Sequence, residues 1–525
     1  MPARNPWLTE SVNPISHLNP AQTDAVLHAG PTNGRKLSTG DVKTVPTVFT
    51  CLAMIKKEGG ETILFAGGLH GISKIIATGE SFQEVSFLPY PGSEALAAKA
   101  TPEAIKGILD EANAAYRAKD DAKIFAVSKK LEEVGFNFTA LMNGIYGFID
   151  KDGFYYALFG GNKIIKATDD NDAKKPIRMV KVKNLAEDLP PELAKSITRM
   201  VGMTITYDGD IVVAGSSPPS KDGKPPVGAL LLLDRDLNLK AKLILPGDAI
   251  DNSIAVDEKG GIYVVTSQRM LKVVWTGKKL SYDEADGGWQ SDYDRTSGED
   301  ELAKGSMSRG SGTTPTLMGF GDDPDKLVVI SDSAKDGANL VAFWRDGIPA
   351  GFKQKPGNKS ARIAGQIRVD ISTLTVECSP NVLGYGVAVI DATYPKSFGR
   401  PEMYANAMTA GVTRPAPLGM QKFNWNPKTH SFENAWVNKK IVSADIIVPI
   451  VSAKSGMIYT TTMEKGEYQY LGLDWETGMV KGLWPVPDDS RVWNSAASIV
   501  ILLDDGDFLI GGYFALKRVN VGDGK

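Results

Sequence analysis

A short pattern of hydrophobic and polar positions repeats along most of the chain: an apolar run, a turn rich in Asp, Lys and Gly, and a second apolar run. Clear copies are NGIYGFIDKDGFYYALFGG from Asn143, VGMTITYDGDIVVAGSS from Val201, NSIAVDEKGGIYVVTS from Asn252 and NSAASIVILLDDGDFLIGG from Asn494. Asp-Gly and Lys-Gly pairs in these turns supply the positive φ that tight hairpins need. Each copy therefore predicts two antiparallel strands.

Further strands extend this pattern into a longer repeat. Looser copies begin at Thr50, Thr314, Asn381 and Asp445, and a third strand such as GGNKIIKAT follows several of the hairpins. A fourth strand is visible in places, which gives about four strands in each of about eight units. Repeated four-stranded antiparallel units are typical of a β-propeller. We predict an all-β fold, a β-propeller in which eight blades are favoured and seven remain possible.

The propeller is expected to occupy residues 46–525, preceded by an N-terminal segment, residues 1–45. The last unit runs out near Asn520 after three strands. The stretch VKTVPTVFT (Val42 to Thr50), or residues before it, is therefore expected to supply a fourth strand and close the ring.

Two stretches depart from the repeat. Residues 101–136 have apolar positions at helical spacing, with Thr101 as a predicted N-cap and Gly135 as a predicted stop. They predict one or two inserted helices, which either decorate the surface or cover one face as a lid. Residues 281–312 are acidic and rich in Gly and Ser, which predicts a flexible surface loop.

Charge, hydropathy and the start of the chain bear on which partners the protein binds and in which compartment it is found. A net charge of −3 over 525 residues offers no general attraction to nucleic acid. No apolar run reaches the length of a membrane span. The start of the chain lacks the apolar core of a secretory signal, so a cytoplasmic protein is expected by default, or a periplasmic or secreted one if a signal was removed. Cys51 and Cys378 are expected to be two buried thiols, although one disulfide remains open.

Polar residues head the first strand of several units. Since the first strand of each blade lines the channel of a propeller, these residues are expected to converge near its axis. Convergent amide and carboxylate oxygens are what Ca²⁺ requires; the alternative is that they cap strands by bonding to neighbouring backbone. The positions are Asn143, Asp251, Asn252, Asn381, Asp445 and Asn494.

The motifs NGIYGFIDKDG and DNSIAVDEKGG resemble strand-opening motifs of the calcium-dependent lactonase propellers, the paraoxonase and gluconolactonase (regucalcin-like) families. The resemblance implies one calcium ion on the axis, with Asn143, Asp251 and Asn252 as ligands, and hydrolysis of lactones and some esters. It covers about two blades. Those families have six blades, and a metal-binding Glu of their first blade has no clear counterpart before Thr50.

Five other residues are candidates for chemistry in an axial pocket. Histidine is scarce, and His70, in a turn between a second and a third strand, is the predicted general base. Glu377 precedes Asn381 and is a candidate acid, base or metal ligand. Arg269 and Lys163 occupy turns like that of His70 and are predicted to bind substrate, with Trp493 stacking at the channel mouth.

Together these features predict an enzyme that acts on a small organic substrate in the axial pocket, by metal-assisted hydrolysis of a lactone or ester with Ca²⁺ as the metal. Two alternatives stay open. One is a non-catalytic propeller that binds a protein or carbohydrate, and the other is a metal-free lyase or isomerase. The sequence predicts neither the substrate nor the oligomeric state.

Overall fold

The polar turns of the repeat close β-hairpins in the computed structural model of the chain. Gly209 (φ +89°) and Gly260 (φ +85°) adopt the left-handed conformation at two of these turns, where a residue with a side chain would be strained. In the second of them, Asp257 Oδ1 accepts hydrogen bonds from the backbone N–H groups of Lys259 and Gly261. The structure describes residues 1–137, 140–220, 223–296, 306, 308–371, 377–398, 405–442, 446–464 and 466–522.

Within these ranges the strands form seven sheets, and all pairs of neighbouring strands are antiparallel except β1 with β27, which is parallel. Five sheets are meanders: β6 (Gly147–Ile149), β7 (Tyr155–Phe159), β8 (Lys163–Thr168) and β9 (Arg178–Asn184); β10 (Arg199–Ile205), β11 (Ile211–Ser216), β12 (Val227–Leu233) and β13 (Leu239–Pro246); β14 (Ala255–Val256), β15 (Gly261–Val265), β16 (Arg269–Trp275) and β17 (Leu280–Ser281), with β18 (Trp289–Asp292) also on β16; β19 (Thr316–Met318), β20 (Leu327–Ser331), β21 (Asn339–Trp344) and β22 (Ile363–Arg368); β23 (Asn381–Leu383), β24 (Gly386–Ile390), β25 (Met420–Asn426) and β26 (Ser431–Asn438).

The remaining two sheets are larger. One has β1 (Ala25–Val26) added to β27 (Ile450–Ser452), β28 (Met457–Glu464), β29 (Glu467–Asp474) and β30 (Val480–Pro485). The other has the order β31 (Ile501–Leu502), β32 (Phe508–Ile510), β33 (Gly512–Val519), β2 (Val42–Glu58), β3 (Glu61–Gly68), β4 (Gly71–Ile76) and β5 (Gln83–Pro89).

The long strand β2 belongs to two four-stranded units. Its first half pairs with β33, from Val42 opposite Val519 to Thr50 opposite Gly512. Its second half, from Thr50 onward, pairs with β3. The N-terminal stretch thus completes the unit made by the last strands of the chain, at the place where the sequence leads us to expect ring closure.

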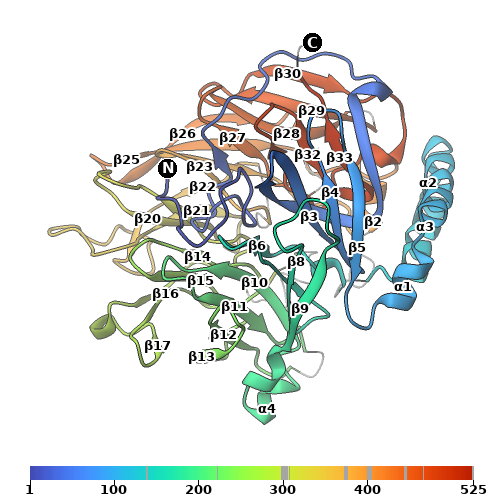
Figure 1. Cartoon of the computed structure of the whole chain (residues 1–525). Helices are drawn as coiled ribbons and strands as arrows, with labels where there is room; N and C mark the ends of the chain where they lie inside the picture. The colour runs from blue at the N-terminus through green and yellow to red at the C-terminus, as the bar shows by residue number, and fades with distance from the viewer. Residues whose placement is uncertain are drawn as a thin grey trace.

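The sheets are arranged as a β-propeller (Figure 1), as predicted. First strands of neighbouring units, such as β6 and β10, contact one another. Both faces of the middle strands are covered, so all six residues of β11 are buried. This double packing is the reason that the apolar runs are continuous rather than alternating. The number of blades depends on whether the sheet that contains β2 is counted as one or two.

The N-terminal segment, residues 5–28, crosses the middle of the ring. It makes a hydrogen bond with the first strand of each four-stranded unit, and most of residues 13–26 are buried. In Figure 1 it is the dark blue trace surrounded by sheets. The contacts are Asn5 with β10, Thr9 and Ser16 with β6, Asn13 with β2, Pro20 with β14, Ala21 with β19, Thr23 with β23, Asp24 with β27 and His28 with β31.

The predicted helical insertion is present at the edge of the ring (Figure 1). The hydroxyl oxygen Oγ1 of Thr101 accepts a hydrogen bond from the backbone N–H of Ala104, and Gly135 ends the second helix with φ +91°. The insertion is docked, because Asp121 binds Arg414 on a distant segment. The helices are α1 (Glu94–Lys99), α2 (Pro102–Arg117), α3 (Asp121–Glu133), α4 (Pro191–Ala194) and α6 (Asn406–Thr409), and the 3-10 turns are η1 (Thr39–Asp41), η2 (Ala140–Met142), η3 (Leu185–Asp188), η4 (Glu284–Asp286) and η6 (Arg491–Trp493).

The prediction of a flexible loop over residues 281–312 is wrong for the first part of that stretch. Residues 289–292 form β18, where Trp289 is buried and donates a hydrogen bond from Nε1 to the carbonyl of Arg345. The prediction relied on the acidic and glycine-rich composition of the stretch and did not take the apolar Trp289 into account. Residues 297–305 and 307 of the predicted loop lie outside the described residues.

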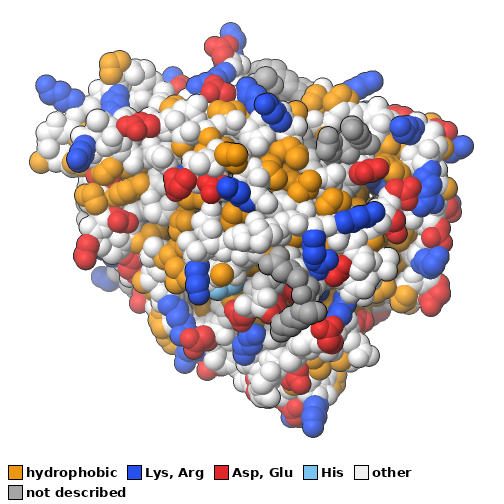
Figure 2. Space-filling model, turned by 90° about the horizontal axis from the view of Figure 1, so that it is seen from above, with side chains coloured by type: hydrophobic (Ala, Val, Ile, Leu, Met, Phe, Trp, Pro, Cys, Tyr) orange, Lys and Arg blue, Asp and Glu red, His pale blue; other side chains and the backbone are white. Residues whose placement is uncertain are grey.

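The surface agrees with the small net charge. On the face shown in Figure 2, acidic and basic side chains alternate without a large area of one sign. Among the helices that the structure describes, none is both long and apolar enough to cross a membrane.

Candidate functional site

A cavity lies on the axis of the ring, next to the N-terminal segment. Residues within or just before the first strands line it, among them Cys51, Tyr146, Arg199, Asn252 and Ser498. Its volume is about 180 Å³, which exceeds the roughly 150 Å³ at which an engineered protein cavity holds benzene. The cavity is therefore large enough for a small organic molecule.

A charged cluster around Asp251 forms part of the cavity wall. Arg309 donates to both carboxylate oxygens of Asp251 from Nε and Nη2, each at 2.8 Å. Arg199 donates to the same carboxylate from Nη2. Burial acts to raise the pKa of Asp251, but the guanidinium groups of Arg199 and Arg309 lower it to about 2. Asp251 is therefore an anion held by two cations.

The neighbouring Asn252 is also held by other side chains. Its Oδ1 accepts hydrogen bonds from the hydroxyl groups of Tyr146 (3.1 Å) and Thr314 (2.8 Å). Its Nδ2 donates to the carbonyl of Gly312. The two residues before β14 therefore have different roles. Asp251 binds two arginines, and Asn252 connects three segments of the cavity wall by hydrogen bonds.

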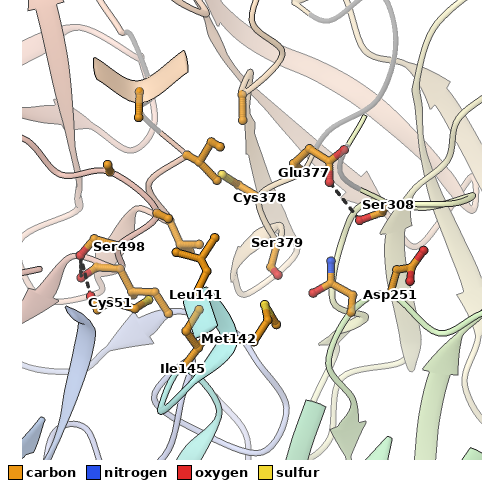
Figure 3. Close-up of a pocket in the computed structure, with 18 of the residues that line it drawn as sticks. Cys51, Leu141, Met142, Ile145, Asp251, Ser308, Glu377, Cys378, Ser379 and Ser498 are labelled. Atoms are coloured by element: carbon orange, nitrogen blue, oxygen red, sulfur yellow. Dashed lines mark hydrogen bonds between the residues drawn. The ribbon is translucent and has the colours of Figure 1, made fainter. Parts of the chain in front are cut away.

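Glu377 contributes a second carboxylate to the cavity wall. Oε1 accepts a hydrogen bond from the hydroxyl of Ser306 at 2.7 Å, and Oε2 accepts one from Ser308 at 3.1 Å. Figure 3 shows Glu377 directed at Ser308, with Asp251 on the same side of the cavity. The two serines fix the carboxylate in place.

The N-terminal segment contributes a buried histidine–aspartate pair. His17 lines the cavity, and its Nδ1 lies 2.8 Å from Oδ2 of Asp24, with side-chain exposures of 4% and 0%. Burial raises the pKa of the Asp24 carboxyl, and the contact with His17 opposes that shift. Within the described residues, no protein group is bonded to Nε2 of His17.

This pair has the geometry of a general base. A carboxylate at Nδ1 favours the tautomer with its proton on Nδ1, which leaves a lone pair on Nε2 to accept a proton in the cavity. Both residues also have left-handed backbone, with φ +61° at His17 and +50° at Asp24. Non-glycine residues in this conformation are strained and cluster at functional sites.

Two thiols also line the cavity. Cys51 and Cys378 are buried and unbonded to one another, so the expectation of two buried thiols is confirmed. Burial raises the pKa of Cys51 to about 12 and also raises that of Cys378. Both are therefore neutral near pH 7 and are poor nucleophiles.

Three predicted site residues line the cavity: Asp251, Asn252 and Glu377. Asn143 and Asn381 instead bind the backbone of neighbouring segments. Asn143 donates to the carbonyl of Leu69 and accepts from the N–H of Gly160, and Asn381 donates to the carbonyl of Pro449. These contacts support the strand-capping alternative for both asparagines. The predicted ligand Asp445 lies outside the described residues.

Asn494 has the same kind of structural role and provides a test of it. Its Nδ2 donates to the carbonyl of Tyr513, and its Oδ1 accepts from the N–H of the same residue, both at 2.9 Å. We expect Asn494→Ala to lower the free energy of unfolding by about 2–4 kcal/mol, because it removes two buried hydrogen bonds between the side-chain amide and the backbone. Denaturant titration measures this loss, with the exposed Asn33→Ala as control. A loss seen only when calcium is present would instead favour the metal-ligand role.

The predicted base His70 lies away from the axial cavity. Its Nε2 is 2.6 Å from the carbonyl of Val134, so it ties its turn to the end of the helical insertion. Burial lowers its pKa. The predicted substrate-binding Arg269 is bound to Asp248 at 2.7 Å and does not line the cavity.

Lys163 and Trp493 are likewise placed elsewhere. Nζ of Lys163 lies over the ring of Phe159 and borders a separate surface pocket. Trp493 is buried in η6, where its Nε1 donates to Asp488. Neither side chain lines the axial cavity.

The surroundings of Asp251 do not favour a calcium ion at that point of the axial cavity. No group of three or more His, Cys, Asp or Glu side chains within the described ranges is arranged to hold a metal. The oxygens of Asp251 are bonded to Arg199 and Arg309, whose positive charges repel a cation at that point. Calcium therefore remains a prediction of the sequence that the geometry at Asp251 does not support.

Sequence reasoning missed His17, Asp24 and Arg199. Arg199 is the first residue of β10, so the rule that singled out Asn252 before β14 could have found it. His17 and Asp24 lie in a segment without strand periodicity, and the scarcity of histidine was the one signal for His17.

The fold defines this chain as a β-propeller, with a cavity on its axis. No family model matches it. A protein of Archaeoglobus fulgidus, described as uncharacterized, is 30% identical over 294 residues, which are 53% of this chain and 53% of that protein. The chain thus spans about half the length of the curated relative that it matches.

Solved structures with low sequence identity are also similar to the chain. Saccharomyces cerevisiae Sqt1 has a TM-score of 0.43 at 8% identity and covers 93% of this chain and 99% of its own. The dihydro-heme d1 dehydrogenase NirN, solved in complex with DHE, has a TM-score of 0.41 at 10% identity, with coverages of 95% and 78%. At these values nothing about the ligands or reactions of those proteins transfers to this chain.

Proposed function

We propose that the protein is an enzyme that hydrolyses an ester or lactone in the axial cavity, with His17 as the general base. The observation that carries this proposal is the His17–Asp24 pair, which is buried, is held at 2.8 Å through Nδ1 and includes a histidine that lines the cavity. General bases need such an orienting partner and an accessible acceptor nitrogen.

The reaction requires one proton acceptor and one oxyanion donor. Nε2 of His17 accepts a proton from water while the water oxygen bonds to the carbonyl carbon. Nη1 of Arg199, which has no partner among the described residues, donates to the carbonyl oxygen as negative charge develops there. The bond to the leaving oxygen then breaks, and His17 returns its proton to that oxygen. The products are a carboxylic acid and an alcohol.

A second candidate is the metal-free lyase or isomerase, which the apolar part of the cavity lining favours. There, His17 would remove a proton from a carbon next to a carbonyl, and Arg199 would stabilise the enolate oxygen. The two candidates share residues and differ in whether water enters the product.

The test is hydrolysis of p-nitrophenyl acetate, p-nitrophenyl butanoate and δ-valerolactone by the purified protein, before and after dialysis against EDTA. We expect hydrolysis that survives chelation, because Arg199 takes the place of a metal in polarising the carbonyl. Loss on chelation that calcium restores would overturn the assigned roles. Absence of hydrolysis, with deuterium from D₂O entering cyclohexanone, would favour the second candidate.

A further inference from the structure

The axial cavity has two chemically different walls. The polar wall includes Arg199 at the start of β10, Asp251 and Asn252 before β14, Ser308 between β18 and β19, and Glu377 before β23. Figure 3 shows Asp251, Ser308 and Glu377 together on one side of the cavity.

The opposite wall is mainly apolar, although it also includes Ser498, whose hydroxyl donates to the carbonyl of Cys51. Leu141 and Met142 of η2, with Ile145 just after them, enter the cavity from the end of the helical insertion. Val448 and Ile499 adjoin them from the segments before β27 and β31. A ligand that fills the cavity therefore has one side against hydrocarbon and one end against polar groups.

Among the described residues of the polar wall, taken together with Arg309 next to it, positive and negative charges are equal in number. Arg199 and Arg309 supply two positive charges, and Asp251 and Glu377 supply two negative ones. Asp251 is fully paired with the arginines, and both serines bind Glu377. A charged ligand would thus enter a buried site without a free counter-ion, which is strongly unfavourable. A sugar-like polyol would leave hydroxyl groups unbonded against the apolar wall, which is also unfavourable.

We infer that the natural ligand is an uncharged, mainly hydrocarbon molecule with one carbonyl oxygen, which binds Nη1 of Arg199 while its carbon chain lies on Leu141, Met142 and Ile145. This inference rests on the proposed function for the choice of site, and it adds the class of substrate. It excludes sugar lactones and free carboxylic acids as the preferred ligands.

The test measures binding of 2-butanone, 2-pentanone and 2-hexanone, which cannot be hydrolysed, by ligand-observed NMR on the wild-type protein. We expect the dissociation constant to fall about fourfold with each added methylene until the cavity is full. Hexanoate and glucose are expected to bind more than tenfold more weakly than 2-hexanone. Tighter binding of hexanoate or glucose, or affinity independent of chain length, would overturn the inference.

Substitutions on each wall distinguish the contributions of the two walls to ketone binding. Arg199→Gln is expected to weaken every ketone about tenfold and to keep the dependence on chain length. Met142→Asn is expected to reduce that dependence, whereas the matched Met142→Leu keeps it. Ketone binding without ester hydrolysis would refute the proposed function but support this inference. Hydrolysis confined to sugar lactones, with no ketone binding, would support the proposed function and refute this inference.

Discussion

Replacing Asp24 with asparagine is expected to lower kcat/KM for ester hydrolysis by about 10²- to 10⁴-fold. The amide of the introduced asparagine would donate a hydrogen bond to Nδ1 of His17, which forces the ring proton onto Nε2 and removes the acceptor from the cavity. The same exchange in a Ser-His-Asp triad costs about 10⁴-fold. The fold is expected to persist, because asparagine tolerates the left-handed φ of +50° at this position.

The matched control is Asp332→Asn. Asp332 is also buried, but it does not line the cavity, and burial raises its pKa to about 7, so an amide resembles its protonated form. Rates are measured with p-nitrophenyl acetate, and folding is checked by circular dichroism. If Asp24→Asn keeps wild-type kcat/KM, or if Asp332→Asn loses as much, the assignment of the pair as a catalytic base is wrong.

Replacing Asp169 with alanine is expected to lower the free energy of unfolding by about 3–5 kcal/mol. Asp169 follows β8, and its oxygens lie 2.5 Å from Nζ of Lys56 on β2 and 2.9 Å from Nζ of Lys74 on β4. All three side chains are at most 2% exposed. Without the carboxylate, the buried Lys74 ammonium loses its counter-ion among the described residues, and the buried Lys56 ammonium keeps only Glu58, at 3.7 Å.

The comparison variant is Asp236→Ala, which removes the partner of Lys166. Asp236 is 79% exposed, and an exposed ion pair contributes roughly 0–1 kcal/mol. Denaturant unfolding of both variants measures the difference. Equal losses would show that the Asp169 network contributes no more than a surface pair. Combining Asp169→Ala with Lys56→Met and Lys74→Met is expected to recover much of the loss.

Most of the fold could be predicted because its signals are local. Apolar runs and turn residues such as Gly209 lie within a few positions of each other and specify hairpins directly. Because the hairpin pattern recurs along most of the chain, it also predicts the repeated sheets. The cap at Thr101 and the helices after it were also predicted from adjacent residues.

The site was harder to predict because its contacts join distant segments. Asparagines before first strands look alike in sequence, yet Asn252 lines the cavity and Asn494 binds backbone. The difference depends on how each segment turns, which the strand pattern does not specify. His17 reaches the axis because residues 5–28 cross the ring, a path determined by hydrogen bonds to strands far along the chain.

In the proposed reaction, His17 is the proton acceptor in the axial cavity. The most direct test compares kcat/KM for p-nitrophenyl acetate in His17→Gln and His70→Gln, with circular dichroism of both variants to confirm folding. We predict that His17→Gln loses at least about 10²-fold while His70→Gln keeps the wild-type value. Full activity in His17→Gln, or a loss confined to His70→Gln, would contradict the account.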